Sequence, residues 1–281
     1  MIAICPNPYR DIKLEITEKI EKMLSEEGFE TCICPVFADS DDAVLPAGKD
    51  CISIEEAAPE CSLAVVIGGD GTILSVARSI HNYEIPIIGI NLGTKGFMAG
   101  IEKDQLEIVA EAAKGNVRYG RRMKLDTRVI RNGECVCADC ALNDAVIHGY
   151  GDCINITASC CGDVITDFSG DGIVVATPTG STGYSMSAGG PIVEPDAENI
   201  IISPICPHAI WARSFVLAPD KKIEVTIRRL HDRRAYLSVD GNSVCDLENG
   251  DILQIGRSEH YTVMAAPENK SFFEITYSKL K

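Results

Sequence analysis

The sequence predicts an α/β domain with a largely parallel sheet, followed by an all-β region that forms two packed sheets. Up to about residue 120, apolar strand-like runs alternate with segments of helical periodicity, as expected when helices cover a parallel sheet. Beyond Gly120, short alternating strands are separated by Asn-Gly and Asp-Gly pairs, which are strong hairpin signals. The 281 residues, 46% of them hydrophobic, are enough for one large domain or two modest ones.

The first half contains uninterrupted apolar runs of the kind found in strands that are buried on both faces. Between the early strands, Ile16, Ile20 and Leu24 recur at helical spacing, and Gly28 stands where a glycine commonly ends a helix. The expected elements are strands over 1–5, 31–37, 63–67 and 85–90, and helices over 12–24, 72–82 and 104–114.

The second half is punctuated by turn signals and contains no long linker, internal repeat or low-complexity segment. The runs 223–230 and 236–239 alternate apolar and polar residues, as half-buried strands do. The tail 271–281 favours a terminal helix over a strand. The expected hairpin turns lie at Asn132-Gly133, Gly162-Asp163, Asp240-Gly241 and Asn249-Gly250.

Charge and hydropathy narrow the class of protein. The net charge of -15 argues against a nucleic-acid partner, because an acidic chain repels phosphate backbones at long range. No apolar run reaches the roughly 18 to 20 residues that span a bilayer, and the N-terminus shows no secretory pattern. We therefore expect a soluble, cytoplasmic protein with no membrane or nucleic-acid partner. Clusters of basic residues, such as Arg118 to Lys124 and Arg228 to Arg234, are interpreted as solvated strand faces, with contact to a pyrophosphate as the alternative.

The 13 cysteines are interpreted as reduced thiols that behave as small buried hydrophobes, for example Cys34, Cys153 and Cys160 in strand-like runs. Cys135, Cys137 and Cys140 suggest a zinc site at first sight. Their C-x-C-x-x-C spacing on an alternating strand does not match the usual paired C-x-x-C ligands, so a metal role is the less favoured alternative.

The stretch Gly68-Gly69-Asp70-Gly71-Thr72 carries the clearest chemical signal. It follows the buried run 63–67 and begins a helix, which places it at the carboxyl end of a parallel strand, where open α/β sheets bind ligands. The glycines allow close approach of a ligand, and their amides with the helix N-terminus suit phosphate oxygens. Asp70 would face that ligand, where it could accept a proton from a hydroxyl or help to hold Mg²⁺.

The alternative for this stretch is a tight structural turn with Asp70 as the helix N-cap. The letters match neither the dinucleotide fingerprint G-x-G-x-x-G nor the Walker motif G-x-x-x-x-G-K-[ST]. A Rossmann dehydrogenase and a Walker-type NTPase are therefore not indicated.

Three further segments combine polar residues with strand ends. In the loop 91–98, Phe97 could line a pocket for a flat ring, although a core position is favoured for Phe97 alone. Asn143-Asp144 interrupts an apolar run, and either binds ribose hydroxyls or forms a bulge or solvent-facing pair. Segment 171–187 runs from a strand into a turn rich in hydroxyls. Its Ser and Thr could hydrogen-bond an adenosine and Tyr184 could stack on a base, while Ser181 or Thr182 could cap a helix.

Cys206 and His208 invite a nucleophile-and-base interpretation. No second orienting group lies near them in the sequence, so a satisfied loop histidine is favoured.

With these segments in order, the whole chain resembles the NAD kinase family. GGDGT at 68–72 is similar to the family's phosphate motif, which lipid kinases and phosphofructokinases share. DGIVVATPTGSTGYSMSAGGPI at 171–192 is similar to its more specific signature. INLGTKGFM, ALND and SPICPHAIWAR follow in the family's order.

The resemblance implies a Rossmann-like α/β domain over 1–120, a β-sandwich domain over 121–264, and a C-terminal tail, about 265–281, that returns to the first domain. It implies ATP and NAD as substrates and a divalent metal such as Mg²⁺, without assigning residues that bind the metal. A homodimer or homotetramer is the usual assembly.

Residue roles follow from the same resemblance. Asp70 would be the general base on the adenosine 2′-hydroxyl of NAD, and Asp171 would bind NAD, with contact across a subunit interface as one arrangement. Tyr184 would lie near a base. The residues implied to bind nucleotide are Gly68, Gly69, Gly71, Thr72, Phe97, Asn143, Asp144, Asp171, Thr182, Gly183, Tyr184, Ser185, Met186, Ser187 and Asn242.

The sequence departs from the family pattern at three positions. Asp144 stands where Glu is more frequent, Gly183 where Ala is usual, and Ser169 where a basic residue is common. The shorter carboxylate changes the reach toward a ribose, and Ser169 removes a phosphate contact.

The implied reaction is in-line transfer of the γ-phosphoryl of ATP to NAD, with the protein chiefly positioning the two nucleotides. The alternatives are a non-catalytic dinucleotide sensor and a lipid or sugar kinase that shares the GGDG turn.

Overall fold

The computed structural model describes residues 1–37, 50–93, 96–230, 233–266 and 271–281. The chain divides into two compact units, Met1–Arg121 with Thr262–Lys281, and Arg122–Tyr261. The first is the expected α/β domain and the second is largely antiparallel β-structure, so the fold-class prediction is confirmed.

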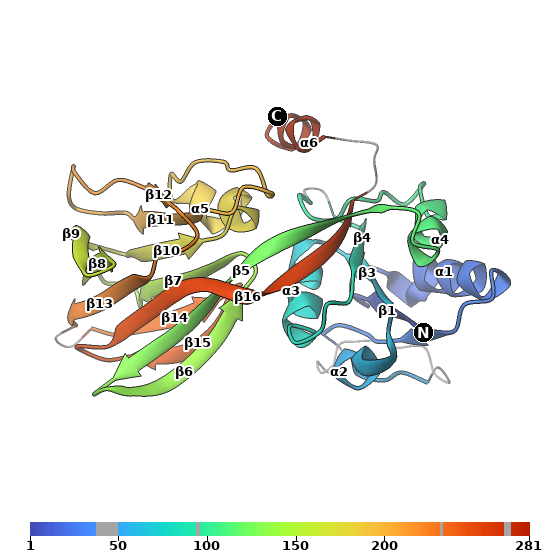
Figure 1. The fold of residues 1–281 in the computed structure, drawn as a ribbon, viewed down its shortest axis with the longest axis horizontal. Helices are drawn as coiled ribbons and strands as arrows, with labels where there is room; N and C mark the ends of the chain where they lie inside the picture. Colours follow the sequence, from blue (N-terminus) through green and yellow to red (C-terminus); the bar gives the residue numbers. More distant parts are fainter. Residues whose placement is uncertain (38–49, 94–95, 231–232, 267–270) are drawn as a thin grey trace. The chain divides into compact units, whose positions relative to one another are not determined.

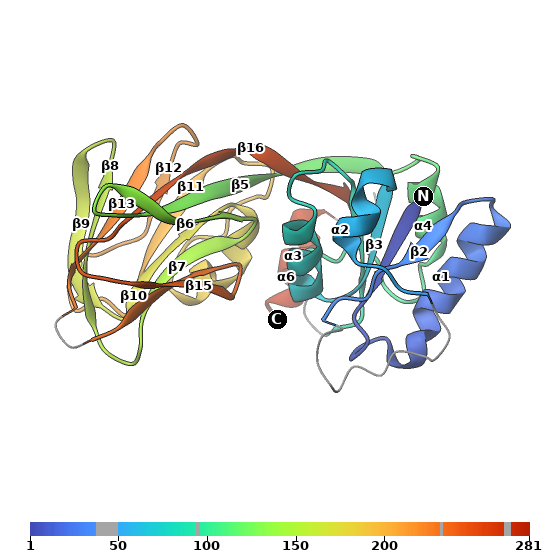
Figure 2. The same ribbon diagram turned by 90° about the horizontal axis from the view of Figure 1, so that it is seen from below.

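The first unit is built on a parallel sheet of order β2-β1-β3-β4. Figure 1 labels β1, β3 and β4 of this sheet. The strands β1, β3 and β4 are buried along their whole length, because helices pack on both faces. Figure 2 shows α1 with α4, and α2 with α3, on opposite sides of these strands. The elements are β1 (Ile2–Pro6), α1 (Glu15–Glu26), β2 (Thr31–Ile33), α2 (Ile54–Ala57), β3 (Leu63–Gly68), α3 (Asp70–Ser79), β4 (Ile87–Asn91), α4 (Glu107–Ala113) and α6 (Phe272–Lys279), with short 3₁₀ turns at Ile12–Leu14 and Ala58–Glu60.

Two boundaries in this unit differ from the prediction for physical reasons. The first helix begins at Glu15, because Lys13 and Leu14 adopt positive φ values of 59° and 57° just before it. The strand expected over 31–37 ends at Ile33, although the amides of Cys34 and Val36 still donate to the carbonyls of Ile4 and Pro6 at 2.8 Å. The extended backbone stops at Phe37, whose φ is 64°. The helix expected in the tail is present as α6.

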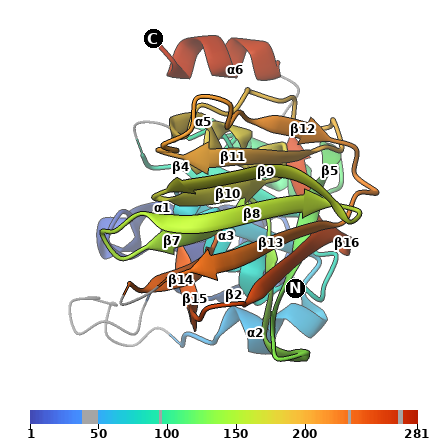
Figure 3. The same ribbon diagram turned by 90° about the vertical axis from the view of Figure 1, so that its left-hand side faces the viewer.

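The second unit contains two antiparallel sheets that share one apolar core (Figure 3). One has the order β12-β11-β10-β7-β14-β15, and the other contains β9, β8, β13 and the first part of β16. The strands are β5 (Arg118–Arg131), β6 (Glu134–Ala141), β7 (Asp144–Gly149), β8 (Ile154–Cys160), β9 (Asp163–Gly170), β10 (Gly172–Ala176), β11 (Ile200–Ile205), β12 (Phe215–Leu217), β13 (Ile223–Arg229), β14 (Ala235–Val239), β15 (Asn242–Leu247) and β16 (Ile252–Ala266).

The hairpin turns follow from backbone φ values. Asn132-Gly133 and Asp240-Gly241 each place two successive residues at positive φ, as predicted. The turn expected at Gly162-Asp163 lies one residue earlier, at Cys161-Gly162, because those residues have φ values of 53° and 93°.

A short 3₁₀ turn (Thr179–Thr182) and α5 (Tyr184–Ser187) follow β10. Gly183 occupies the N-cap position of α5, so the assignment of Ser181 or Thr182 as the cap is wrong. Ser181 instead exchanges two hydrogen bonds with the backbone of Val193, with Oγ to carbonyl and amide distances of 3.1 and 3.0 Å.

Three expectations about side-chain exposure need correction. Lys124, assigned to a solvated strand face, is 1% exposed. Among the cysteines expected to be buried, Cys34 is buried but Cys153 and Cys160 are only partly so. All 13 cysteines are free. None of the helices in the described ranges combines the length and apolarity needed to cross a membrane.

Candidate active site

The GGDGT turn joins β3 to α3 at the carboxyl edge of the parallel sheet. Gly69 is the N-cap of α3 and Asp70 is its first residue, so the alternative in which Asp70 caps the helix is wrong. The Asp70 carboxylate instead accepts hydrogen bonds from the backbone amides of the next loop, at 2.8 Å from Phe97, 3.1 Å from Met98 and 3.4 Å from Ala99. These bonds fix the orientation of the carboxylate and hold that loop against the turn.

The glycines of this turn have different roles. A Cβ on Gly68 would lie 2.3 Å from Thr72 Oγ1, so Gly68 is required for helix packing. Thr72 is 2% exposed, and its hydroxyl accepts hydrogen bonds from Asn7 Nδ2 at 3.2 Å and from the Gly69 amide at 3.4 Å. Gly71 is exposed, and a Cβ added to it would meet no atom of the described residues within 4 Å. Asp70 and Gly71 are therefore the parts of this motif that a ligand can reach.

The loop after β4 completes this part of the site. A Cβ on Gly96 would lie 3.2 Å from Asp70 Oδ1 and 3.3 Å from Asn91 Oδ1, so the backbone approaches both side chains closely. Phe97 is partly buried, and its amide is engaged by Asp70. Thr94 and Lys95 of the same segment lie outside the described residues.

The second unit places Asn143 and Asp144 at the start of β7. Asp144 is 6% exposed, so the solvent-facing interpretation of this pair is wrong. The Asp240 carboxylate accepts hydrogen bonds from the amides of Leu142 at 2.8 Å, Asn143 at 2.7 Å and Asp144 at 3.1 Å. Three successive amides are thus held by one side chain.

The turn after β10 packs directly against this pair. The Thr177 hydroxyl donates to the Leu142 carbonyl at 2.6 Å and accepts from the Gly180 amide at 3.1 Å. A Cβ on Gly180 would lie 2.1 Å from the carbonyl oxygen of Asn143. At Gly183, a Cβ would lie 3.5 Å from Asn143 Nδ2 and 3.7 Å from Asp144 Oδ2. The structure therefore brings together two segments that are separate in the sequence.

The residues predicted in 182–187 divide into outward and inward groups. Tyr184 is 37% exposed, Ser187 is exposed, and Thr182 and Met186 are partly buried. Ser185 is fully buried, and its hydroxyl lies 3.3 Å from that of Ser203. Its side chain therefore supports the turn from inside.

Beside Tyr184 lies His148 of β7, a residue that belongs to none of the predicted motifs. The Tyr184 hydroxyl and His148 Nε2 are 2.5 Å apart, and the two rings stack with centroids separated by 5.8 Å. The ring of Tyr236 in β14 also stacks with that of His148, with centroids 6.0 Å apart. His148 could have been identified only from the pairing of β7 with β14, whose register places it opposite Tyr236.

Asp171 lies between β9 and β10 and meets two thiols. Cys153 Sγ is 3.7 Å from Asp171 Oδ1, and a hydrogen bond to Asp171 raises the pKa of the Cys206 thiol. Cys153 Sγ also lies 3.6 Å from His208 Nε2. A raised pKa keeps the Cys206 sulfur protonated, which argues against its use as a nucleophile. Asn242 is exposed at the β14–β15 turn.

The electrostatics of the second unit centre on Asp144. Burial raises the pKa of its carboxyl to about 7, and the neighbouring charge of Asp240 adds to this. Burial also raises the pKa of Asp240, while its three amide hydrogen bonds and the charge of Lys124 act in the opposite direction. Desolvation likewise raises the pKa of Tyr184. Asp144 is therefore partly protonated at neutral pH.

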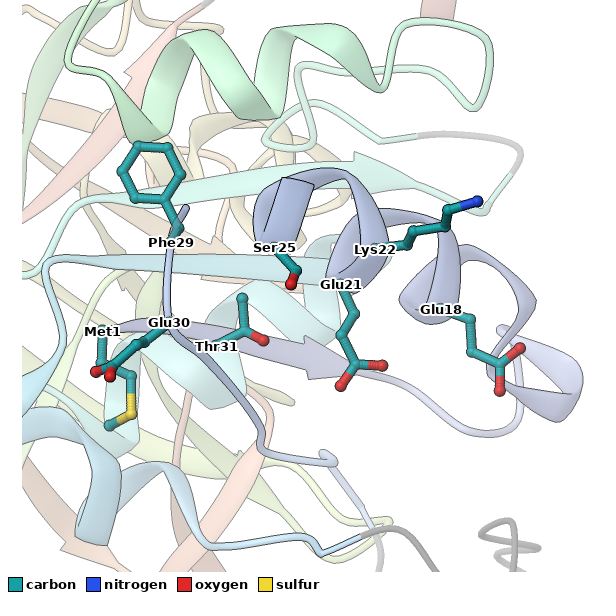
Figure 4. A pocket seen from close by; sticks show the side chains of 8 residues that line it. All are labelled: Met1, Glu18, Glu21, Lys22, Ser25, Phe29, Glu30 and Thr31. Atoms are coloured by element: carbon teal, nitrogen blue, oxygen red, sulfur yellow. The ribbon is translucent and has the colours of Figure 1, made fainter. Parts of the chain in front are cut away.

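A surface pocket of about 670 Å³ lies elsewhere in the first unit (Figure 4). It is lined by Met1, Glu18, Glu21, Lys22, Ser25, Phe29, Glu30 and Thr31. Met1 and Thr31 lie at the starts of strands β1 and β2, so this pocket opens at the amino edge of the parallel sheet. Ligands of open α/β sheets bind at the carboxyl edge, where Asp70 lies. None of the predicted site residues lines this pocket.

Among the described residues, no group of three or more His, Cys, Asp or Glu side chains is arranged to hold a metal ion. This applies to the Cys135, Cys137 and Cys140 group as well.

Comparison with known proteins identifies the family. The model of the ATP-NAD kinase N-terminal domain matches residues 2–114, and that of the ATP-NAD kinase C-terminal domain matches residues 142–266. The NAD kinase of Trichlorobacter lovleyi is 40% identical over 222 residues, which cover 78% of each chain. The NAD kinase of Acetivibrio thermocellus is 34% identical over 99% of this chain and 96% of its own. The chain belongs to the ATP-NAD kinase family.

Solved structures agree with this assignment. The NAD kinase from Archaeoglobus fulgidus, solved in complex with ATP, superposes with a TM-score of 0.79 at 25% identity, covering 100% of this chain and 98% of that one. The yeast NADH kinase, solved with NADH, shares the fold with a TM-score of 0.86 at 24% identity, covering 99% and 86%. As an ATP-NAD kinase family member, the chain is a phosphotransferase.

Proposed function

We propose that the chain is an NAD kinase that transfers the γ-phosphoryl of ATP to the 2′-hydroxyl of the adenosine ribose of NAD, giving NADP. One observation carries the proposal beyond family membership. The Asn143–Asp144 pair and the turn of the 171–192 signature, far apart in the sequence, pack against each other within the unit that matches the NAD kinase C-terminal domain. The amide, carboxyl and aromatic groups gathered there suit an adenosine, whose ribose offers hydroxyl donors and whose base offers a flat face.

Asp70 is proposed as the base that orients and deprotonates the 2′-hydroxyl. An ionised carboxylate has about four lone-pair sites, and the amides of residues 97–99 occupy three of them. One site is left for a substrate hydroxyl, in a fixed direction. Gly71 and the N-terminus of α3 are proposed to border bound phosphates, since exposed amides at a helix N-terminus favour anions.

The remaining proposals concern the setting of the reaction. Asp171, Tyr184 and Asn242 are proposed as further NAD contacts, and the enzyme is expected to act in the cytoplasm as a homodimer or homotetramer. A divalent cation such as Mg²⁺ would arrive with the phosphates of ATP, whose charge it neutralises.

The deciding experiment measures NADP formation from NAD, ATP and Mg²⁺ with an NADP-specific dehydrogenase as the coupling enzyme. We expect Asp70→Asn to lower kcat by roughly 10² to 10⁴, the usual contribution of a general base, while the Kd for NAD changes only a few-fold. Asp104→Asn, an exposed substitution in the same unit, serves as the control.

Each alternative function makes a different prediction for this assay. Thermal unfolding of Asp70→Asn separates a catalytic loss from collapse of the loop that Asp70 holds. An unchanged kcat in a folded Asp70→Asn variant would remove the base assignment. NAD binding without turnover in the wild type would favour a dinucleotide sensor, and phosphorylation of a lipid or sugar alcohol alone would favour the other kinases.

A further inference from the structure

Two aspartates, Asp240 and Asp144, are neighbours where β14 ends and β7 begins. The antiparallel register pairs Val239 with Ala145, which places Asp240 beside Asp144. The backbone confirms this closeness, because the Asp240 amide donates to the Asp144 carbonyl at 3.0 Å. Like charges so close together cannot both be ionised without cost.

The hydrogen bonds of the two carboxyls differ. Asp240 accepts from three successive amides, those of residues 142–144, and such bonds favour the ionised form of a carboxyl. The described residues supply no comparable set of amides to the Asp144 side chain, whose Oδ2 faces the Gly183 backbone instead. When the pair holds a single negative charge, that charge therefore resides on Asp240 and the proton on Asp144.

Other titratable groups around the pair support this distribution. Lys124 of β5 is 1% exposed, and its Nζ has no hydrogen-bond partner among the residues that the structure describes. Its charge acts on Asp240, whose pKa it lowers. Tyr184 of α5 also faces Asp144 electrostatically, but it is neutral near pH 7 because desolvation raises its pKa from 10. The anion on Asp240 is thus the charge that acts most directly on Asp144.

We propose that Asp240 is a positioning residue for nucleotide binding, which holds the Asn143–Asp144 backbone and keeps the proton on Asp144 until NAD binds. The inference rests on the proposed function, in which Asp144 accepts hydrogen bonds from the adenosine ribose. The reacting hydroxyl gives its single proton to the base, so Asp144 accepts from the neighbouring hydroxyl of that ribose, and its ionised form is the stronger acceptor. NAD affinity then falls about tenfold for each pH unit below the titration of Asp144, and NAD binding near neutral pH releases a proton.

The test begins without ligand. The carboxyl carbons of ¹³C-labelled aspartate are titrated by NMR in the wild type and in Asp240→Asn, with Asp144→Asn used to assign the resonance of Asp144. We expect Asp144 to titrate near pH 7 in the wild type and at least about one pH unit lower in Asp240→Asn. Asp246→Asn, an exposed substitution on the same hairpin, should leave the midpoint unchanged.

Calorimetric titration with NAD at pH 6 and pH 8 then measures the consequence. We expect the wild-type Kd to be about tenfold higher at pH 6 than at pH 8, and Asp240→Asn to lose most of this difference. At pH 8, where Asp144 is ionised in both proteins, the variant Kd should be about tenfold higher because Asn supplies one oxygen to three amides. A purely structural role would raise Kd equally at both pH values and leave the Asp144 midpoint in place.

An Asp144 midpoint that is the same in Asp240→Asn would overturn the proposal. If Asp240→Asn does not fold, the NMR titration of the wild type still tests the proposal. An Asp144 midpoint below about pH 5 in the wild type would also overturn the proposal. Failure of NAD to bind at any pH would reject the proposed function instead, and the NMR titration would still test the link between the two carboxyls.

Discussion

Gly180 offers a sharp test of how the site is assembled, because its substitution acts on the contact between the two nucleotide-binding segments. A Cβ at this position would lie 2.1 Å from the Asn143 carbonyl oxygen, 2.6 Å from its carbon and 2.9 Å from its Cα, against 3.4–4 Å for ordinary contact. All three atoms belong to the backbone, so no side chain can rotate away. In Gly180→Ala, the turn or the strand start must move.

The size of the effect follows from what holds the two segments in place. The Asn143 backbone is fixed by Asp240, and Gly180 is fixed by Thr177, so relief of the clash breaks some of these hydrogen bonds. Overpacking in a rigid core costs about 1–3 kcal/mol, and the upper value applies here. In a unit of this size, 3 kcal/mol corresponds to a Tm lower by roughly 10 °C. Misplacement of Asn143 and Asp144 by about 1 Å can lower kcat/KM for NAD on the order of 10²-fold.

Two matched glycine substitutions isolate the cause. At Gly183, a Cβ would lie 3.2 Å from the nearest atom, the Gly180 carbonyl oxygen, so Gly183→Ala should change stability by less than about 1 kcal/mol. Gly256→Ala in β16 meets no described atom within 4 Å and reports the effect of the methyl group alone. Differential scanning calorimetry and NAD saturation kinetics on the three variants provide the comparison. A Gly180→Ala protein that melts and turns over like Gly256→Ala would refute the argument that this close approach is required.

Two further predictions concern polar groups in the same unit. Thr177→Val leaves two buried backbone groups without their hydrogen-bond partner, so it should lower the free energy of unfolding, measured in urea, by about 2–3 kcal/mol. Thr166→Val is the control. It should be neutral or stabilising, because the buried Thr166 hydroxyl has no partner in the described structure. A larger loss for Thr166→Val would contradict this. The pKa of Asp144 rises from 3.8 to about 7 on folding, so the folded protein holds a proton that the unfolded chain has released, and stability falls as pH rises from 4 to 7. Asp144→Asn should remove this decline, on the order of 4 kcal/mol at most, and equal slopes of unfolding free energy between pH 4 and 7 in both proteins would refute the assignment.

The α/β half of the fold could be predicted because its signals are local. Buried parallel strands read as continuous apolar runs, and the structure has β3 and β4 where 63–67 and 85–90 were expected. The errors fall where backbone geometry decides a boundary. Lys13 and Leu14 are residue types that a helix accepts, and only their positive φ values delay the start of the helix to Glu15. Cys161 is not a usual first residue of a hairpin turn, so the signal at Gly162-Asp163 was displaced by one position.

The residues of the candidate site could be predicted where they belong to a sequence motif. They could not be predicted where only the pairing of two distant strands brings them together. Asp70 and Tyr184 lie in motifs with a recognisable sequence context. Asp240 was noted only as a turn residue, because its contact with residues 142–144 depends on the pairing of β14 with β7 across nearly 100 positions of sequence. His148 was missed for the same reason. No local pattern distinguishes an ordinary histidine on a strand from one that stacks with two tyrosines.

The residues of the nucleotide-binding motifs fall into two groups in the structure, those that shape the turns and those that a substrate can reach. Thr72, Thr177 and Ser185 belong to the segments that resemble nucleotide-binding signatures, yet each hydroxyl is buried and bonded within the protein. Such residues shape the turn, and their loss should act first on stability. Asp70 and Tyr184 combine internal bonds with exposure, so their loss should act on the reaction with a smaller effect on folding. A similarity in sequence letters identifies both kinds together, and only the direction of each hydroxyl or carboxylate decides which residues a substrate can meet.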